Sequence, residues 1–365
     1  MTRNAALLAT MALVVAACPG GASPSPSPAP PTASASASAV ATPGPTTVAT
    51  PSASGSPTSP VNPAWARLGV GEGPAPREDH TWSVDPASGT AWLFGGRNGG
   101  TVFDDVWSFD LATERWTAVD AAGDAPEARF GHTGTWVDGF GLVVWSGQSG
   151  GDFFADIRAF DPATIRWTEL PAAGAPPEAR YGSCAALGPD GRVWISHGFT
   201  HAGRFADTRG YDFATRAWAE VSVEGKRPVK RCLHDCLWTP DGLLVLYAGQ
   251  TDGVAALGDL WTLDPAGRWT EAATPDPAAR QLYALAGTGS SGWVFGGRDV
   301  NGAYLDDLWN LDLATLRWRP VEAGIGPAGR AGATLVDDPA RGRLLLFGGV
   351  GESGASDEMW ELALR

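Results

Sequence analysis

The sequence has 365 residues, of which 44% are hydrophobic, so it can bury the core of one large domain or of two ordinary ones. Its 48 glycines indicate many turns, and they favour short strands over long helices. The formal net charge of -14 argues against nucleic acid as a partner, because binding phosphates requires a basic surface.

The chain starts with the pattern of a bacterial secretory signal. A mainly apolar run of 13 residues from Ala5 to Ala17 follows a charged start, and it is too short to span a bilayer as a mature helix. Its end, Val15-Ala16-Ala17-Cys18, resembles the lipobox of bacterial lipoproteins, whose cysteine is diacylated and becomes the mature N-terminus. We therefore expect residues 1–18 to be a lipoprotein signal peptide and Cys18 to be lipidated. An ordinary signal peptide with a chance cysteine is the alternative.

A lipidated Cys18 implies an exported protein, anchored on the outer side of the cytoplasmic membrane or cell envelope. Residues 19–62 consist almost entirely of Pro, Ser, Ala, Thr and Gly, and the first aromatic residue is Trp65. Such a segment cannot bury enough surface to offset the entropy of ordering it. The sequence therefore predicts a disordered tether over 19–62 and a folded domain over 63–365.

The folded part repeats one unit six times. A tryptophan after a turn recurs at spacings of 51, 51, 51, 51 and 49 residues: Trp65, Trp116, Trp167, Trp218, Trp269 and Trp318. A glycine that ends an apolar run recurs at spacings of 51, 51, 51, 48 and 52: Gly96, Gly147, Gly198, Gly249, Gly297 and Gly349. An acidic-aliphatic-Trp motif starts at Asp105, Asp259, Asp307 and Glu358, and the second and third units keep only Asp156 and Asp207 of it.

Each unit contains four short apolar runs, which in the first unit are His80–Val84, Thr90–Phe94, Asp105–Phe109 and Arg115–Val119. Four strands in about 50 residues are typical of one blade of a β-propeller. The glycine pair, the Asp-Leu-Trp motif and the later tryptophan together resemble the kelch repeat, and the resemblance covers residues 64–365. It implies an all-β fold, a six-bladed kelch-type β-propeller.

The two ends of the folded part complete each other. After Gly349 the chain supplies only one more strand, Met359–Leu364, so the last blade lacks its outer strand. The segment from Pro63 to Leu68 has the pattern of that strand. We expect it to complete the last blade and close the ring, as is usual in the kelch family. A ring closed in this way has no raw sheet edge, and we expect it to be monomeric.

Every unit also has a Pro-x-x-Arg motif before its first strand, which is the innermost strand of a propeller blade. The arginines are Arg77, Arg129, Arg180, Arg231, Arg280 and Arg330. Six equivalent arginines predict a ring around the central channel or its mouth. They are our candidates for binding a ligand, since arginines at comparable places contact acidic peptides in some kelch proteins. The alternative is structural, with each arginine paired to an aspartate or to backbone carbonyls.

Three cysteines lie in the folded part, and an odd number permits at most one internal disulfide. Cys184 belongs to the first strand of the third blade, whereas Cys232 and Cys236 belong to that of the fourth. We expect Cys184 to bridge to either Cys232 or Cys236. Cys232 cannot pair with Cys236, because four strand residues span about 13 Å and a disulfide tolerates about 7 Å between Cα atoms.

The histidines do not indicate a metal site. His80, His132 and His234 each fall three residues after a repeat arginine, which predicts a buried, hydrogen-bonded role. His197 and His201 form a His-x3-His pair, but that spacing presents two ligands together on a helix and not in a loop. We expect no metal and no cofactor.

The sequence favours a binding or scaffold module whose propeller face binds a protein or glycan ligand, which could be anionic. Its contact with a membrane is expected through the lipid anchor only. The alternative is a carbohydrate-active enzyme of the kelch type, a sugar isomerase or an oxidase-like protein, although no catalytic residue is identified. A purely structural surface protein is a third interpretation. An acid or base in the channel would favour the enzyme, and an open face with aromatic and arginine side chains would favour the binding module.

Overall fold

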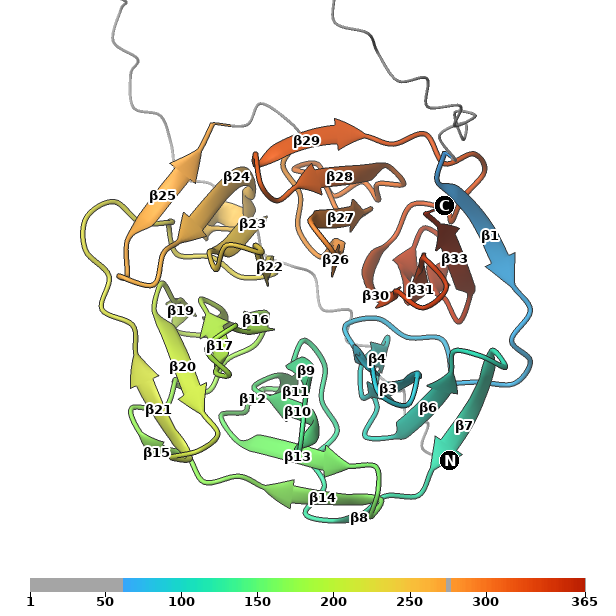
Figure 1. Cartoon of the computed structure of the whole chain (residues 1–365), viewed down its shortest axis with the longest axis horizontal. Coiled ribbons are helices and arrows are strands. Elements are labelled where there is room, and N and C mark those ends of the chain that lie inside the picture. The colour runs from blue at the N-terminus through green and yellow to red at the C-terminus, as the bar shows by residue number, and fades with distance from the viewer. Residues whose placement is uncertain (1–61, 274–276, 365) are drawn as a thin grey trace, which may run out of the picture. The chain divides into compact units, whose positions relative to one another are not determined.

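The computed structural model describes residues 62–273 and 277–364, and every structural statement below concerns these residues. They form six blades around a central channel, each blade an antiparallel sheet with four main strands (Figure 1). The predicted all-β, six-bladed propeller is therefore confirmed. The predicted signal peptide, Cys18 and nearly all of the tether lie outside the described residues. Within them, no helix is both long and apolar enough to cross a membrane.

The four main strands of each blade follow one another from the channel outward. Blade 1 consists of β2 (Thr81–Asp85), β3 (Thr90–Phe94), β6 (Val106–Asp110) and β7 (Arg115–Val119). Blade 2 consists of β9 (Thr133–Val137), β10 (Gly141–Trp145), β13 (Ile157–Asp161) and β14 (Arg166–Glu169). Blade 3 consists of β16 (Cys184–Leu187), β17 (Val193–Ser196), β20 (Thr208–Asp212) and β21 (Ala217–Glu220).

The other three blades have the same order. Blade 4 consists of β22 (Asp235–Trp238), β23 (Leu244–Gln250), β24 (Ala256–Leu263) and β25 (Trp269–Ala272). Blade 5 consists of β26 (Ala284–Thr288), β27 (Ser291–Phe295), β28 (Leu308–Asp312) and β29 (Arg317–Pro320). Blade 6 consists of β30 (Ala331–Asp338), β31 (Arg343–Gly351), β33 (Met359–Ala363) and β1 (Ala64–Leu68).

Short elements decorate this frame. Small hairpins follow the second strand in blades 1, 2 and 3: β4 (Arg97–Asn98) with β5 (Thr101–Val102), β11 (Gln148–Ser149) with β12 (Asp152–Phe153), and β18 (Phe199–Thr200) with β19 (Gly203–Arg204). In blade 6, β32 (Gly354–Ala355) pairs with β31, and in blade 4 a single 3-10 turn, Asp252–Val254, takes the corresponding place. The two-residue strands β8 (Ala122–Gly123) and β15 (Ala173–Gly174) add to the outer edges of blades 2 and 3.

The ring is closed by the N-terminal strand, as predicted. Strand β1 pairs antiparallel with β33 from Ala64 opposite Ala363 to Leu68 opposite Met359 (Figure 1). The Trp65 ring also packs edge-on against Phe295 of blade 5, with 5.3 Å between ring centroids. The closing strand therefore joins two blades, and its Trp65 side chain packs against the core between them.

The backbone conformation explains why a glycine recurs at the end of the second strand of each blade. The last glycine of each blade has a positive φ, between 90° and 115°, and its N–H donates to the carbonyl of the repeat arginine in the next blade at 2.8–3.0 Å. A Cβ on Gly96 would come within 2.8 Å of the Glu78 carbonyl oxygen. In blades 2, 3 and 4 the preceding residue is Ser146, His197 or Ala248, each at a φ of 55–59°. These blades therefore keep the left-handed geometry without the glycine pair.

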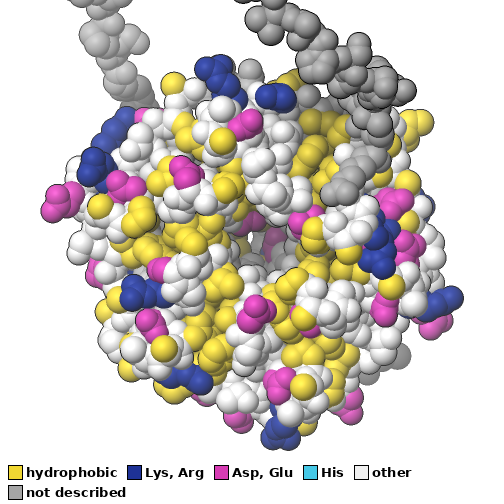
Figure 2. Space-filling view, viewed as in Figure 1, with side chains coloured by type: hydrophobic (Ala, Val, Ile, Leu, Met, Phe, Trp, Pro, Cys, Tyr) yellow, Lys and Arg dark blue, Asp and Glu magenta, His cyan; other side chains and the backbone are white. Residues whose placement is uncertain are grey.

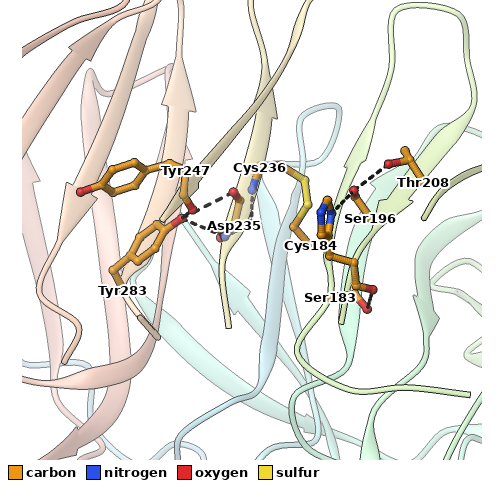
Figure 3. Close-up of a disulfide and its surroundings, with 9 residues drawn as sticks. Ser183, Cys184, Ser196, Thr208, Asp235, Cys236, Tyr247 and Tyr283 are labelled. Carbon is orange, nitrogen blue, oxygen red and sulfur yellow. Dashed lines mark hydrogen bonds between the residues drawn. A yellow bond between two sulfur atoms is a disulfide. The ribbon is translucent and has the colours of Figure 1, made fainter. Parts of the chain in front are cut away.

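A disulfide joins the innermost strands of blades 3 and 4. It links Cys184 to Cys236, whose Cα atoms are 5.6 Å apart, and it lies beside Asp235 and Tyr283 (Figure 3). The structure thus selects Cys236 from the two predicted partners. Cys232 is a buried free thiol.

Candidate functional site

The six repeat arginines are buried in the blades, with between 0% and 5% of their surface exposed. Each guanidinium faces the carboxylate of the acidic-aliphatic-Trp motif in its own blade. In the first five blades two nitrogens donate to the two carboxylate oxygens at 2.6–3.1 Å, and in the sixth one nitrogen donates to Glu358 at 2.7 Å. The pairs are Arg77–Asp105, Arg129–Asp156, Arg180–Asp207, Arg231–Asp259, Arg280–Asp307 and Arg330–Glu358.

Further donors of each arginine are also used. In blade 4, Arg231 donates to the carbonyls of Ala248 at 2.9 Å and Val229 at 3.1 Å, and the other blades repeat this pattern. Burial by itself would raise the pKa of Asp259, but the hydrogen bonds and the charge of Arg231, together with the hydrogen bond from Trp261, outweigh it and hold that pKa below its usual value. Four of the five N–H donors of Arg231 are thus used inside the blade, three of the bonds being to the carboxylate and to the Ala248 carbonyl, and such a buried, bidentate pair is a structural contact.

The arginines therefore support the structural alternative, and the arrangement does not place them as ligand-binding groups. They do not line the channel, whose wall starts two residues after each of them.

The same contact explains why the acidic-aliphatic-Trp motif recurs in the sequence. The tryptophan of the motif donates its indole N–H to the carboxylate, as Trp261 does to Asp259 at 2.7 Å. In blades 2 and 3 an arginine, Arg158 or Arg209, donates to it instead.

The channel is narrowed by a closed circle of backbone hydrogen bonds. The residue two positions after each repeat arginine has a φ of 55–65°, and its N–H donates to the equivalent carbonyl of the preceding blade at 2.8–3.0 Å. The circle runs through Asp79, Gly332, Leu282, Leu233, Gly182 and Gly131. Three of the six positions are glycine, which adopts this backbone without a steric cost. In blade 1 the position carries a carboxylate.

Beyond this circle lies a cavity of about 180 Å³ along the channel. His80, His132 and His234 line it and are buried, as predicted, but neither ring nitrogen of His80 has a hydrogen-bond partner among the described residues. Burial lowers the pKa of His132 to about 3, so this imidazole is neutral. Asp235 also lines the cavity, and burial raises its pKa to about 7 although its carboxylate accepts the Cys236 N–H at 2.8 Å.

His197 and His201 do not form a joint site. His197 is fully buried and its Nδ1 is 2.7 Å from the Ser196 hydroxyl oxygen, whereas His201 is exposed beside Phe153. In the part of the chain that the structure describes, no cluster of three or more His, Cys, Asp or Glu side chains has the arrangement of a metal site.

One mouth of the channel carries side chains that differ from blade to blade. We call it the hairpin-side mouth, because the hairpins of blades 1 to 3 lie there. It consists of the residues that follow the repeat glycine, all half-buried: Arg97, Gln148, Phe199, Gln250, Arg298 and Val350. Backbone bridges pair each of them with the residue that follows the repeat arginine: Glu78, Phe130, Tyr181, Cys232, Gln281 and Ala331.

Aromatic rings occupy this mouth on the side of blades 2 and 3. The Tyr181 ring lies 6.0 Å from both the Phe130 and the Phe199 ring, between centroids. Phe153, from the hairpin of blade 2, lies 6.3 Å from Phe199. The Tyr181 ring covers Gly131 so closely that a Cβ there would come within 2.3 Å of it. Three of these four rings are half-buried and so keep part of their surface exposed.

An arginine with two carboxylates lies next to these rings in blade 1. Arg97 is 3.1 Å from Glu78 and 3.0 Å from Asp79, and its guanidinium stacks 4.2 Å from the centre of the Phe130 ring. Burial, and after it the charge of Asp79, raise the pKa of Glu78 to about 7. Burial also raises the pKa of Asp79. Glu78 is therefore a carboxyl group that can gain or lose a proton near neutral pH.

Two further arginines lie at the mouth. Arg204 of blade 3 pairs with the exposed Asp252 at 3.0 Å and lies over the Phe199 ring at 5.4 Å. Arg298 of blade 5 stacks on Tyr304 at 4.8 Å and has no carboxylate within 4.0 Å among the described residues. The hairpin-side mouth thus combines exposed aromatic surface, arginines and a titratable carboxyl.

None of these mouth residues was singled out from the sequence as a binding candidate. The signal that could have found them is their position, directly after the repeat arginine or the repeat glycine, where the units stop resembling one another. Both features that would separate the two predicted functions are present. An aromatic and arginine face exists, and carboxyl groups with raised pKa lie in the channel and at its mouth.

Comparison with known proteins finds a matching family model and several proteins of similar sequence. A family model described as the KLHDC2/KLHL20/DRC7 Kelch-repeats domain matches residues 60–249. N-(sulfonatooxy)prop-2-enimidothioate sulfolyase of Thlaspi arvense is 27% identical over 333 residues, which cover 81% of this chain and 94% of the sulfolyase. Kelch domain-containing protein 10 of Xenopus tropicalis is 27% identical over 250 residues, 64% of this chain and 59% of that protein. Acyl-CoA-binding domain-containing protein 4 of Arabidopsis thaliana is 27% identical over 285 residues, 72% of this chain and 42% of that protein.

Proposed function

This chain belongs to the kelch-repeat family, and from that premise we propose that it is a binding module whose ligand sits on the hairpin-side mouth. The observation that carries the proposal is the aromatic cluster of the buried Phe130 and the half-buried Phe153, Tyr181 and Phe199, flanked by Arg97 and Arg204. Aromatic and arginine side chains are the ones enriched at the centres of protein interfaces.

The mouth also has the rigidity that tight binding requires. Tyr181 is packed on Gly131, and Arg97 is held by two carboxylates and a ring, so ordering them on binding costs little additional entropy. A protein segment or a glycan both suit stacking on aromatic rings. An anionic group on the ligand would find its counterpart in Arg298, which lacks a carboxylate partner among the described residues.

A screen of the chain against acidic peptides and glycans tests the proposal. Phe153→Ala and Arg298→Ala should each weaken binding of a retained ligand, because each removes surface at the mouth without breaking an ion pair of the described residues. The matched controls are Val300→Ala, at an exposed apolar residue, and Arg166→Ala, at an exposed arginine on an outer strand. Binding that survives both mouth variants, or that both controls weaken equally, would overturn the proposed site.

We also propose that the module works at the cell envelope, anchored through a lipid on Cys18. The support is the Val15-Ala16-Ala17-Cys18 sequence after the apolar run. Mass spectrometry of the mature N-terminus should find a diacylated Cys18, and Cys18→Ser should move the protein from the membrane fraction to the soluble one. An unmodified N-terminus at another residue would contradict the anchor.

A second function is favoured by one specific observation, the Glu78 carboxyl with a pKa of about 7 beside Arg97. A general acid or base works best when its pKa is near the operating pH. The sulfolyase relative makes one substrate worth testing, N-(sulfonatooxy)prop-2-enimidothioate. If the wild type consumes this compound and Glu78→Gln does not, the result would support an enzymatic function. If neither protein consumes it, the compound is excluded as a substrate.

A further inference from the structure

The opposite mouth of the channel has a different character. We call it the turn-side mouth, because the turns between the first and second strands of the blades surround it. A hollow of about 580 Å³ lies there, lined by residues of blades 1 to 5. Five of them hold the same repeat position, seven residues after the repeat arginine: Val84, Trp136, Leu187, Trp238 and Gly287.

Most of the lining of this hollow is apolar. Trp136 and Trp238 are half-buried, and Leu187 is 38% exposed, which is unusual for a leucine in this protein. Leu237 and Leu313 form part of its lining. Its volume is that of a site for a small molecule or a large side chain. The hairpin-side mouth takes no part in this hollow, so the two sites are separate.

Acidic side chains border the hollow. Asp138 lines it, Asp85 lies at the end of β2 in blade 1, and Asp190 and Asp241 lie in the turns of blades 3 and 4. None of these four carboxylates has a Lys, Arg or His side chain within 4.0 Å in the described part of the chain. The hydrogen bonds that Asp85, Asp138 and Asp190 accept come from backbone N–H, indole or hydroxyl donors, none of which carries a charge. In the view of Figure 2, hydrophobic side chains border the central opening and acidic ones lie beside it, whereas Lys and Arg lie toward the perimeter.

The basic side chains near these turns are engaged elsewhere. Arg192, in the same turn as Asp190, faces Asp212 of the outer turn at 3.5 Å. In blade 6, Arg341 and Arg343 both pair with Asp338, at 3.3 and 3.0 Å. The carboxylates at the turn-side mouth are therefore left without positive partners, and their charges are not neutralised within the protein.

We infer that the turn-side mouth binds a basic peptide segment and places one Lys or Arg side chain in the hollow. Tryptophan rings attract cations at their faces, and the apolar wall suits the methylene stem of such a side chain. Four carboxylates spread over four blades exceed what one charge can satisfy. A peptide with several positive charges matches them, and the net charge of -14 would speed its approach.

Fluorescence anisotropy of a labelled hexa-arginine peptide with the full chain tests this inference. The double variant Asp138→Asn/Asp241→Asn should weaken binding about tenfold, since it removes two rim charges. The matched control is Asp110→Asn/Asp161→Asn in the outer turns, which changes the net charge equally and should alter affinity less than about twofold. An equal loss in both pairs would show general attraction to an acidic surface and overturn the site.

A second arm tests the hollow itself. Trp136→Leu keeps an apolar wall and removes the indole, so it should weaken the peptide about fivefold if a cation stacks there. Unchanged affinity in this variant, with the fold verified by circular dichroism, would contradict insertion of a side chain. Tetramethylammonium should compete only at concentrations far above those of the peptide. If tetramethylammonium competes at concentrations comparable to those of the peptide, the inference of a peptide ligand would be overturned, and the site would be one for a small organic cation.

Discussion

Two positions of the repeat differ in their role: the repeat arginine holds each blade together, and the residue after the repeat glycine faces the hairpin-side mouth. The arginine is the same in all six blades and is at most 5% exposed, with its guanidinium paired inside the blade. The residue after the glycine is of four different types in the six blades and is half-buried in all of them. Positions at which the units agree therefore hold the ring together. Positions a few ångströms away, at which the units disagree, are the ones a ligand can reach.

The same division separates the two mouths of the channel. The hairpin-side mouth has arginines, aromatic rings and a titratable carboxyl, whereas the turn-side mouth has tryptophans and aspartates without a positive partner among the described residues. Both are built from inner-strand ends that the arginine pairs and the backbone circle keep in place. A fixed frame with two variable openings is what allows one propeller to present two different chemistries.

Loss of the closing strand should have the largest effect on the frame. Deleting residues 63–69 removes the whole pairing with β33 and the Trp65 contact to Phe295. An open edge in blade 6 should lower the unfolding temperature and promote aggregation. Thermal unfolding followed by light scattering measures both. An unchanged melting curve would show that blade 6 is stable without β1.

Breaking the disulfide should have the next largest effect. The bridge between Cys184 and Cys236 spans 52 residues, so its loss should lower the free energy of unfolding by roughly 4 kcal/mol. Denaturant unfolding of Cys184→Ser/Cys236→Ser measures it. The control Cys232→Ser leaves the bridge intact and should change stability far less. Three reactive thiols in the denatured propeller, instead of one, would mean that the bridge does not form.

Replacing one repeat arginine should cost about 3 kcal/mol of stability, because it leaves a carboxylate without its partner inside the blade. Arg231→Ala is the clearest case, since both Asp259 and the Ala248 carbonyl lose a donor. The control is Arg166→Ala, at an exposed arginine outside every ion pair of the described residues, which should stay within about 0.5 kcal/mol. Equal losses of stability in the two variants would contradict a structural role of the repeat arginines.

The last expected effect is a change in the pH dependence of stability. Burial raises the pKa of Asp235 to about 7 from an ordinary 3.8, so the folded protein binds this proton more strongly than the unfolded one. The contribution of Asp235 to stability must therefore fall as the pH rises from about 4 to about 7. Asp235→Asn should be more stable relative to wild type at pH 8 than at pH 4. Unfolding midpoints at both values measure this difference, and an equal difference at both would contradict the raised pKa.

Much of the propeller fold was predictable because its sequence motifs recur in six units. The spacing of Trp116 and its equivalents, the strand from Pro63 to Leu68 and the choice of partners for Cys184 all led to features that the structure contains. Repetition also showed that the arginines are equivalent. It could not show that they are buried, because equivalence in sequence says nothing about where a side chain points.

The mouths could not be predicted in the same way. Glu78 and Arg97 are 19 positions apart, and only the bridge between inner strand and hairpin brings them together. The hydrogen-bonded role expected for His80 also failed, since its ring nitrogens have no partner among the described residues. Sites assembled from non-repeating residues need the folded ring to become visible.

Arginine labelling tests the central claim most directly, that the repeat arginines are interior and the mouth arginines are accessible. The native protein would be treated with phenylglyoxal, and modified peptides would be counted by mass spectrometry over time. Arg67 and Arg268, whose side chains are 61% and 73% exposed, should react first, and Arg97, at 30%, should react more slowly. The six repeat arginines should stay unmodified until the protein unfolds. Modification of any of the six at the rate of Arg97 in the folded protein would contradict the account.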